Sequence, residues 1–161
     1  MRHGAGSPGA AARRRPYRFA PALVLAAAAL LWQAQPAAAH GYRLGAIQIG
    51  HLWAKPPEGD TLVVLGPLLN TGTSPDRLVG ASSPAARAVG FVVRSGGEDR
   101  AADGLDLPPG RPVSLAPWAA RIELEGLTEA PRAGATVPMT LTFEHAGRID
   151  VEVVVQDKAG E

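Results

Sequence analysis

The side chains of this 161-residue chain that could bind a metal or catalyse a reaction are few: four histidines, two methionines and no cysteine. The absence of cysteine excludes thiolate metal sites and cysteine nucleophiles. His51, close to Trp53, is expected to be a partly buried, hydrogen-bonded imidazole. His145 is expected to be a solvated turn residue. Met139 is expected to fill a gap in the core rather than to bind a metal.

No catalytic motif accompanies these residues. Ser82-Ser83-Pro84 has no neighbouring histidine with a supporting acid, and the sequence contains neither a nucleophile elbow nor a phosphate-binding glycine loop. We therefore predict that the protein is not an enzyme.

Charged and apolar residues alternate in Arg121-Ile122-Glu123-Leu124-Glu125. Because successive strand residues point to opposite faces, Arg121, Glu123 and Glu125 are expected to share one face of a strand. The simplest interpretation is a solvated face, on which ion pairs contribute only about 0–1 kcal/mol. The alternative is a patch for a partner protein, to which an exposed Trp118 in the preceding turn would contribute.

Short β-like segments separated by Gly, Pro, Ser and Asp predict an all-β sandwich or barrel. The strongest prediction is a β-hairpin whose turn is Glu144–Gly147, with one buried face and one solvent-exposed face. Leu62 to Leu69 is a predicted strand covered on both faces, in which Pro67 requires a bulge or an edge position. Val89 to Arg94 is a further predicted strand, followed by a polar loop over 95–99. The apolar face of the hairpin is formed by Val137, Met139, Leu141, Phe143, Ile149, Val151, Val153 and Val155.

Residues 1–39 have the pattern of a cleaved export signal, with a basic start, an apolar run from Phe19 to Trp32 and a small-residue end. The run is shorter than the roughly 20 residues of a membrane span, so we expect no span after signal removal. We predict cleavage after Ala39 and one domain of residues 40–161. The Arg14-Arg15 pair leaves both the general and the twin-arginine export routes open.

Signal removal also changes the charge balance. Five of the 16 Lys and Arg residues lie in residues 1–39, so the remainder carries 11 basic against 15 acidic side chains. A mildly acidic domain disfavours nucleic acid as a partner.

Cleavage after Ala39 would make His40 the N-terminal residue. Its free amine and imidazole, with the amide of Gly41, would offer nitrogen ligands to cupric ion, which binds such donors strongly. The alternative is that the residue after a cleavage site varies freely and binds nothing. His40 is the candidate metal ligand of this sequence.

Five segments, in order, resemble the periplasmic copper chaperones of the PCu(A)C family across roughly Ile47 to Val155. This resemblance implies a cupredoxin-like Greek-key β-sandwich or barrel in the periplasm. It further implies a role in carrying copper toward cytochrome oxidase assembly, with a protein of copper delivery or oxidase assembly as partner. The segments are Ile49–Ala54, Asp76–Ala86, Leu107–Gly110, Leu115–Leu127 and Val137–Gly147.

The family holds cuprous copper with two His and two Met, soft donors that suit this ion. The matching segments place these donor positions on Val92, on Asp99 or Arg100, and on Arg121 and Glu123. A guanidinium has no free lone pair, and a carboxylate is a hard donor. The usual copper site is therefore predicted to be absent.

Two functions remain open from the sequence. The first is an exported copper chaperone-like protein that binds copper elsewhere, for example at His40. The second is a periplasmic β-sandwich interaction protein that binds no metal and uses the surface of Trp118, Arg121 and Glu123.

Overall fold

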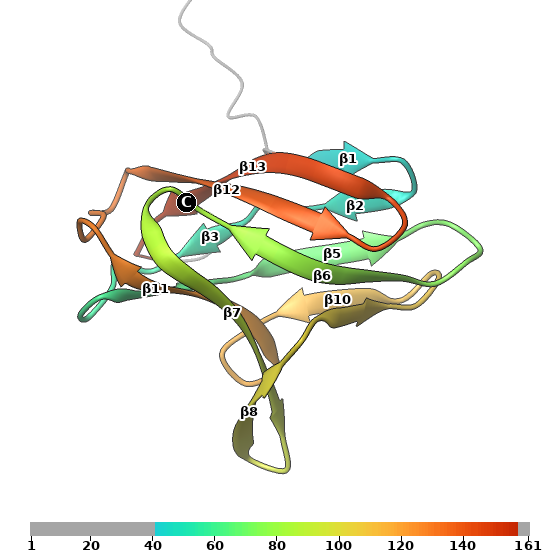
Figure 1. The fold of residues 1–161 in the computed structure, drawn as a ribbon, viewed down its shortest axis with the longest axis horizontal. Coiled ribbons are helices and arrows are strands. Elements are labelled where there is room, and N and C mark those ends of the chain that lie inside the picture. Colours follow the sequence, from blue (N-terminus) through green and yellow to red (C-terminus); the bar gives the residue numbers. More distant parts are fainter. Residues whose placement is uncertain (1–40, 158–161) are drawn as a thin grey trace, which may run out of the picture. The chain divides into compact units, whose positions relative to one another are not determined.

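The computed structural model describes residues 41–157, which form β-strands joined by turns (Figure 1). These described residues belong to one compact unit. The predicted export signal, its cleavage site and His40 lie outside the described residues. Among the residues that are described, no helix is long and apolar enough to cross a membrane.

The larger sheet has eight strands within residues 41–157, in the order β1-β2-β5-β10-β11-β7-β8, with β4 beside β11. Neighbouring strands are antiparallel except β10 and β11, which are parallel. Its strands are β1 (Tyr42–Leu44), β2 (Ile47–Ile49), β4 (Thr61–Val64), β5 (Gly66–Asn70), β7 (Ala86–Ser95), β8 (Glu98–Ala102), β10 (Pro112–Leu115) and β11 (Ala120–Leu127).

The smaller sheet has five strands in the described region, in the order β3-β13-β12-β6-β9. The predicted C-terminal hairpin is its centre, with Met139 opposite Val151 and Leu141 opposite Ile149. Its strands are β3 (Trp53–Ala54), β6 (Asp76–Ser82), β9 (Leu105–Leu107), β12 (Thr136–Phe143) and β13 (Gly147–Val155).

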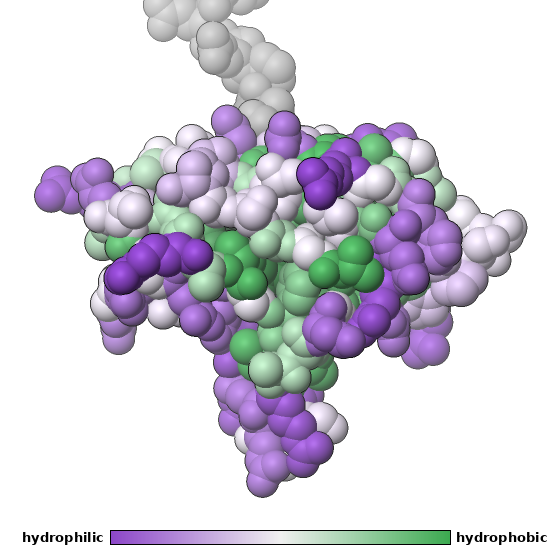
Figure 2. All heavy atoms as spheres, viewed as in Figure 1, coloured by the Kyte–Doolittle hydropathy of each residue, from purple (hydrophilic) through white to green (hydrophobic). Residues whose placement is uncertain are grey.

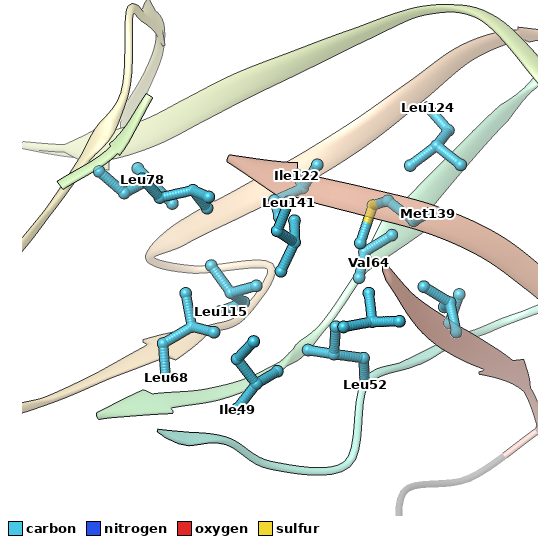
Figure 3. Close-up of a cluster of buried hydrophobic side chains, with 14 of the residues drawn as sticks. Ile49, Leu52, Val64, Leu68, Leu78, Leu115, Ile122, Leu124, Met139 and Leu141 are labelled. Carbon is cyan, nitrogen blue, oxygen red and sulfur yellow. The ribbon is translucent and has the colours of Figure 1, made fainter. Parts of the chain in front are cut away.

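The hydrophobic core contains side chains from both sheets (Figure 3). Ile122 and Leu124 of β11 and Leu141 of β12 are fully buried, and Met139 is 2% exposed. Strands such as β4 and β12 bury every second residue, so the apolar alternation in the sequence becomes the inner face of a sandwich. The predictions of an all-β sandwich, of a half-buried hairpin and of Met139 as a core residue are confirmed.

The apolar run from Leu62 is two strands rather than one. Val64 of β4 pairs with β11, whereas β5 pairs with β10. The break falls at Gly66, whose φ of 139° is left-handed and where a Cβ would lie 2.5 Å from the carbonyl oxygen of His51. Only glycine fits this close approach.

Pro67 does not lie on an edge strand, because β5 pairs with both β2 and β10. Its carbonyl oxygen accepts a hydrogen bond from the backbone N–H of Gly50 at 2.9 Å, just past the end of β2. In a strand the N–H and C=O of one residue point to the same side. Proline has no N–H to donate, but on this side of Pro67 strand β2 has already ended, so no ladder hydrogen bond from Pro67 to β2 is lost. An edge position was therefore not required.

The end of β7 and its partner β8 form an arm that extends away from the sandwich (Figure 1). Gly96 and Gly97, both with positive φ, make its turn, and hydrophilic residues cover its end (Figure 2). The predicted polar loop over 95–99 was too long, because Ser95 pairs with Glu98 and Arg94 with Asp99. Polar composition misled here: an exposed hairpin needs only a short glycine turn.

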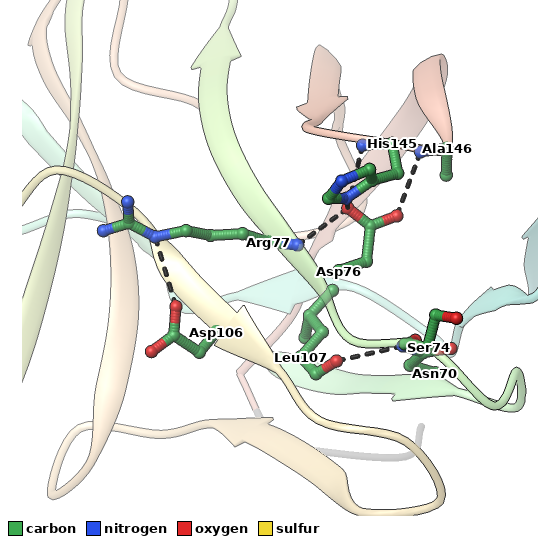
Figure 4. Close-up of polar contacts among 8 residues, drawn as sticks. All are labelled: Asn70, Ser74, Asp76, Arg77, Asp106, Leu107, His145 and Ala146. Atoms are coloured by element: carbon green, nitrogen blue, oxygen red, sulfur yellow. Dashed lines mark hydrogen bonds and ion pairs between the residues drawn. The ribbon is translucent and has the colours of Figure 1, made fainter.

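Asp76, 8% exposed, fixes the turn between β12 and β13 to the start of β6 (Figure 4). Its carboxylate accepts backbone hydrogen bonds from Arg77 at 2.7 Å and from His145 and Ala146 at 3.0 Å. Burial by itself would raise the pKa of Asp76, but these hydrogen bonds hold the pKa below its ordinary value. The side chain of His145 is 71% exposed, which confirms it as a solvated turn residue.

Asn70 is the other buried polar anchor near this turn (Figure 4). Its Nδ2 donates to the carbonyl oxygens of Ser74 at 2.8 Å and Leu107 at 3.0 Å, and its Oδ1 accepts from the N–H of Gly72 at 2.9 Å. One fully hydrogen-bonded amide thus holds the 71–75 turn and β9 together.

Candidate functional site

The charged residues of β11 form an ion-pair cluster with the β7–β8 arm. The Nε of Arg121 donates to Oε1 of Glu123 at 2.6 Å, and its Nη2 donates to Oδ2 of Asp99 at 2.8 Å. Nη1 of Arg94 lies 3.6 Å from Oδ1 of Asp99. We call Asp99, Arg121 and Glu123 the Arg121 cluster.

The Arg121 cluster is largely covered. The side chain of Arg121 is 12% exposed and that of Glu123 is 19% exposed, whereas that of Asp99 is 41% exposed. The prediction of a solvated strand face is therefore wrong for Arg121 and Glu123, and holds for Glu125, which is exposed. Tertiary packing around β11, which the strand pattern cannot show, makes the difference.

Within the cluster, Asp99 and Arg121 each favour the charged form of the other. The hydrogen bond to Asp99 is the main cause that raises the pKa of Arg121, and the hydrogen bond from Arg121 is the main cause that lowers the pKa of Asp99. The two opposite charges therefore stabilise each other.

The strand register explains why these residues meet. Val92 of β7 lies directly opposite Arg121 of β11, and Asp99 of β8 lies opposite Arg94 of β7. Arg100, the neighbour of Asp99, instead pairs with Glu98 at 3.2 Å. Of the two positions left open by the sequence, Asp99 is the one in contact with Arg121.

These side chains do not fit a cuprous ion. Arg121 offers no lone pair, and the carboxylates of Asp99 and Glu123 are hard donors already hydrogen-bonded to it. Nowhere among residues 41–157 do three or more His, Asp or Glu side chains gather so that they could hold a metal ion. The chemistry that the cluster can perform is hydrogen bonding and charge pairing.

A groove of about 550 Å³ opens beside the Arg121 cluster. It is lined by Trp53 and the 55–58 segment on the β3–β4 side, and by Pro117 and Trp118 of the turn before β11. The side chains of Arg94 and of the whole Arg121 cluster also line it. We call this the Trp118 groove.

Trp118 is 78% exposed, as the sequence predicted for an interaction surface. The structure therefore brings Trp118, Arg121 and Glu123 to one groove, and adds Trp53, Arg94 and Asp99 to them. Sequence reasoning missed Trp53 and Arg94 as site residues and left Asp99 open beside Arg100, because only pairing between strands brings these residues close.

His51 lies apart from this groove's lining. Its Nε2 is 3.3 Å from Oε1 of the buried Gln156, and the ring is partly buried. The prediction of a hydrogen-bonded, partly buried imidazole is confirmed.

The fold is that of PCuAC domains. The copper-bound PCuAC domain from PmoF2 is 31% identical with a TM-score of 0.66, and covers 74% of this chain and 99% of its own. The apo PCuAC domain from PmoF1 is 24% identical with a TM-score of 0.67, over 74% of this chain and 100% of its own. The solution structure of CuI-DR1885 from Deinococcus radiodurans shares the fold at 22% identity and a TM-score of 0.58, over 78% of this chain and 87% of its own.

The chain belongs to the LpqE-like family, described as "Putative lipoprotein LpqE-like", whose family model matches residues 46–155. A relative from Leifsonia xyli subsp. xyli (strain CTCB07), named "Putative lipoprotein Lxx21020", is 31% identical over 125 residues. This match spans 74% of the chain and 75% of the relative.

Proposed function

We propose that this chain is an exported PCuAC-like domain that binds another protein through the Trp118 groove and holds no cuprous copper there. The guanidinium of Arg121, held between Asp99 and Glu123, is the observation that carries the proposal. It occupies a position at which the PCu(A)C resemblance places a copper donor.

The burial of the cluster supports this assignment. A cuprous ion would have to displace an arginine that is 12% exposed and would then meet only hard oxygen donors. Tight binding of a soft ion at such a place is physically unfavourable. An exposed indole beside a covered ion-pair cluster instead offers the aromatic and arginine chemistry typical of protein interfaces.

Copper binding at the new N-terminus that cleavage after Ala39 would create is the second candidate. It is favoured by the copper-bound PCuAC domain among the similar structures. In this version the protein is a copper chaperone-like protein that delivers copper to an extracytoplasmic partner, for example in oxidase assembly. His40, freed by cleavage after Ala39, would supply the amine and imidazole.

Export is proposed from residues 1–39 and is supported by the relative named as a lipoprotein. The 161 residues contain no cysteine, so a thioether-linked lipid has no attachment point within them. Cleavage by a general signal peptidase after Ala39 is consistent with this composition.

Titration of the 40–161 chain with cuprous and cupric ions, in competition with a chelator of known affinity, tests both versions. A second chain carrying one extra residue before His40 is the matched control, because it moves the free amine away from the imidazole. We expect no tight cuprous binding by either chain. Tight binding abolished by the extension would establish His40 as the ligand, and tight binding lost only in Arg121→Ala would refute our reading of the cluster.

The interaction role is tested by capture from an extracytoplasmic extract with the 40–161 chain as bait. Trp118→Ala should lose the captured protein, whereas Val79→Ala should keep it. Val79, on β6 of the other sheet, is a suitable control because it is the other large exposed hydrophobic residue of the described region. Equal retention by the two variants would contradict the proposed surface.

A further inference from the structure

We propose that the Trp118 groove binds an extended, proline-containing segment of the partner protein in the polyproline II conformation. This inference rests on the proposed function and names the chemistry of its partner.

The walls of the groove carry the chemistry that such segments require. Trp53 and Trp118 both line the groove, together with Pro56, Pro57 and Pro117. A polyproline II helix has no internal hydrogen bonds and presents ring faces and free carbonyl oxygens. Indoles match both features, since the ring packs against proline and its N–H donates to a carbonyl.

The charges of the groove favour an uncharged occupant. Its lining includes three cationic residues, Lys55, Arg94 and Arg121, and three anionic ones, Glu58, Asp99 and Glu123. Arg121 is paired with both Asp99 and Glu123, and Arg94 lies near Asp99. A net charge of zero gives no electrostatic preference for an acidic or a basic peptide. An uncharged proline-rich segment does not depend on electrostatic attraction for binding.

Backbone hydrogen bonds hold the two aromatic walls in place. The turn that carries Trp118 is closed by the N–H of Ala116 donating to the carbonyl oxygen of Ala120 at 2.8 Å, and by the N–H of Ala119 donating to that of Ala116 at 3.1 Å. Trp53 exchanges two backbone hydrogen bonds with Leu65, at 2.8 and 2.9 Å. A groove already formed before binding loses little entropy when it receives a stiff polyproline II ligand.

Nuclear magnetic resonance titration of the 40–161 chain with a blocked oligoproline peptide tests the proposal. The indole N–H signals of Trp53 and Trp118 should shift on addition of oligoproline and stay unchanged with a glycine-serine peptide of equal length. Trp118→Ala should weaken the binding by about tenfold or more, as for an aromatic anchor at an interface. Val79→Ala should bind like the unchanged chain.

Absence of oligoproline binding would overturn the inference, and so would equal binding of the glycine-serine peptide or retained affinity in Trp118→Ala. Self-association of the chain that disappears in Trp118→Ala would show a second copy as the occupant and would also overturn it. The copper titration is independent of these results. A chain that binds neither cuprous copper nor oligoproline would refute this inference and leave the interaction role itself standing.

Discussion

Replacement of Arg121 by methionine tests the central claim that a guanidinium and two carboxylates form one cluster. Arg121→Met keeps an unbranched side chain of similar reach but removes the charge and both hydrogen bonds. Glu123, whose side chain is 19% exposed, would then lie partly desolvated without a partner. A hydrogen bond to a charged group contributes about 1.5–3 kcal/mol, and breaking a fully buried pair costs about 3–5 kcal/mol.

The cluster is open to solvent at its Asp99 end, so we expect Arg121→Met to lower the free energy of unfolding by about 2 kcal/mol. For a domain of this size that corresponds to a fall in Tm of about 8 °C. Urea unfolding and thermal melts followed by circular dichroism measure both values. Glu125→Gln is the matched control, because this exposed carboxylate on the same strand face should change stability by less than about 0.5 kcal/mol.

The double variant Arg121→Met/Glu123→Met should recover at least half of the loss, since it leaves no covered carboxylate without a partner at position 123. A single variant as stable as the unchanged protein, or a double variant less stable than the single one, would refute the reasoning.

Acid should reduce the difference between the unchanged protein and Arg121→Met. The pKa of Asp99 in the folded protein lies below its ordinary value of 3.8, chiefly because Arg121 donates a hydrogen bond to it. This stabilisation is fully present above that ordinary value and is lost as the pH falls through the lowered pKa. The Tm gap should therefore stay wide above pH 3.8 and narrow as the pH falls below that value. A gap that widens in acid would contradict the assignment of the pair.

Three further substitutions test the fold around the site. Asp76→Asn should destabilise the protein by about 2 kcal/mol at neutral pH, because three backbone N–H groups lose a charged acceptor. The lowered pKa of Asp76 predicts that this loss fades as the pH falls, and a pH-independent loss in urea unfolding would disprove it. Asn70→Ala should cost about 2–3 kcal/mol, since it orphans three backbone groups; a change below about 0.5 kcal/mol would show that water replaces the amide. Gly66→Ala should cost about 2 kcal/mol or more through its left-handed φ and the clash with His51, and an unchanged Tm would mean that the β4–β5 break can relax.

Much of the fold could be predicted because the alternation of apolar and polar residues along a strand indicates which of its faces is buried. Met139 and its neighbours on β12 alternate strictly, and the structure buries that face. The break at Gly66 and the place of Pro67 could not be predicted in the same way. They depend on where β2 ends and on the approach of the His51 carbonyl, which are contacts between segments far apart in the chain.

The candidate site likewise has a part that the sequence predicts and a part that stays untested. The types and spacing of Arg121 and Glu123 already show, by sequence alone, that soft copper donors are missing from β11. The proposed ligand His40 and the proposed cleavage after Ala39 stay predictions, because they lie outside the described residues.

By itself the sequence determined the class of fold, the membership of the chain in its family and the absence of soft donors at Arg121 and Glu123. Only the tertiary structure decided that these two residues are covered and share a cluster with Asp99, because the pairing of β7 with both β8 and β11 brings residues 22 positions apart into hydrogen-bond contact. Alternation along one strand specifies which face a side chain occupies. What lies above that face depends on other segments, here the Trp118 turn and the 53–58 segment that line the groove.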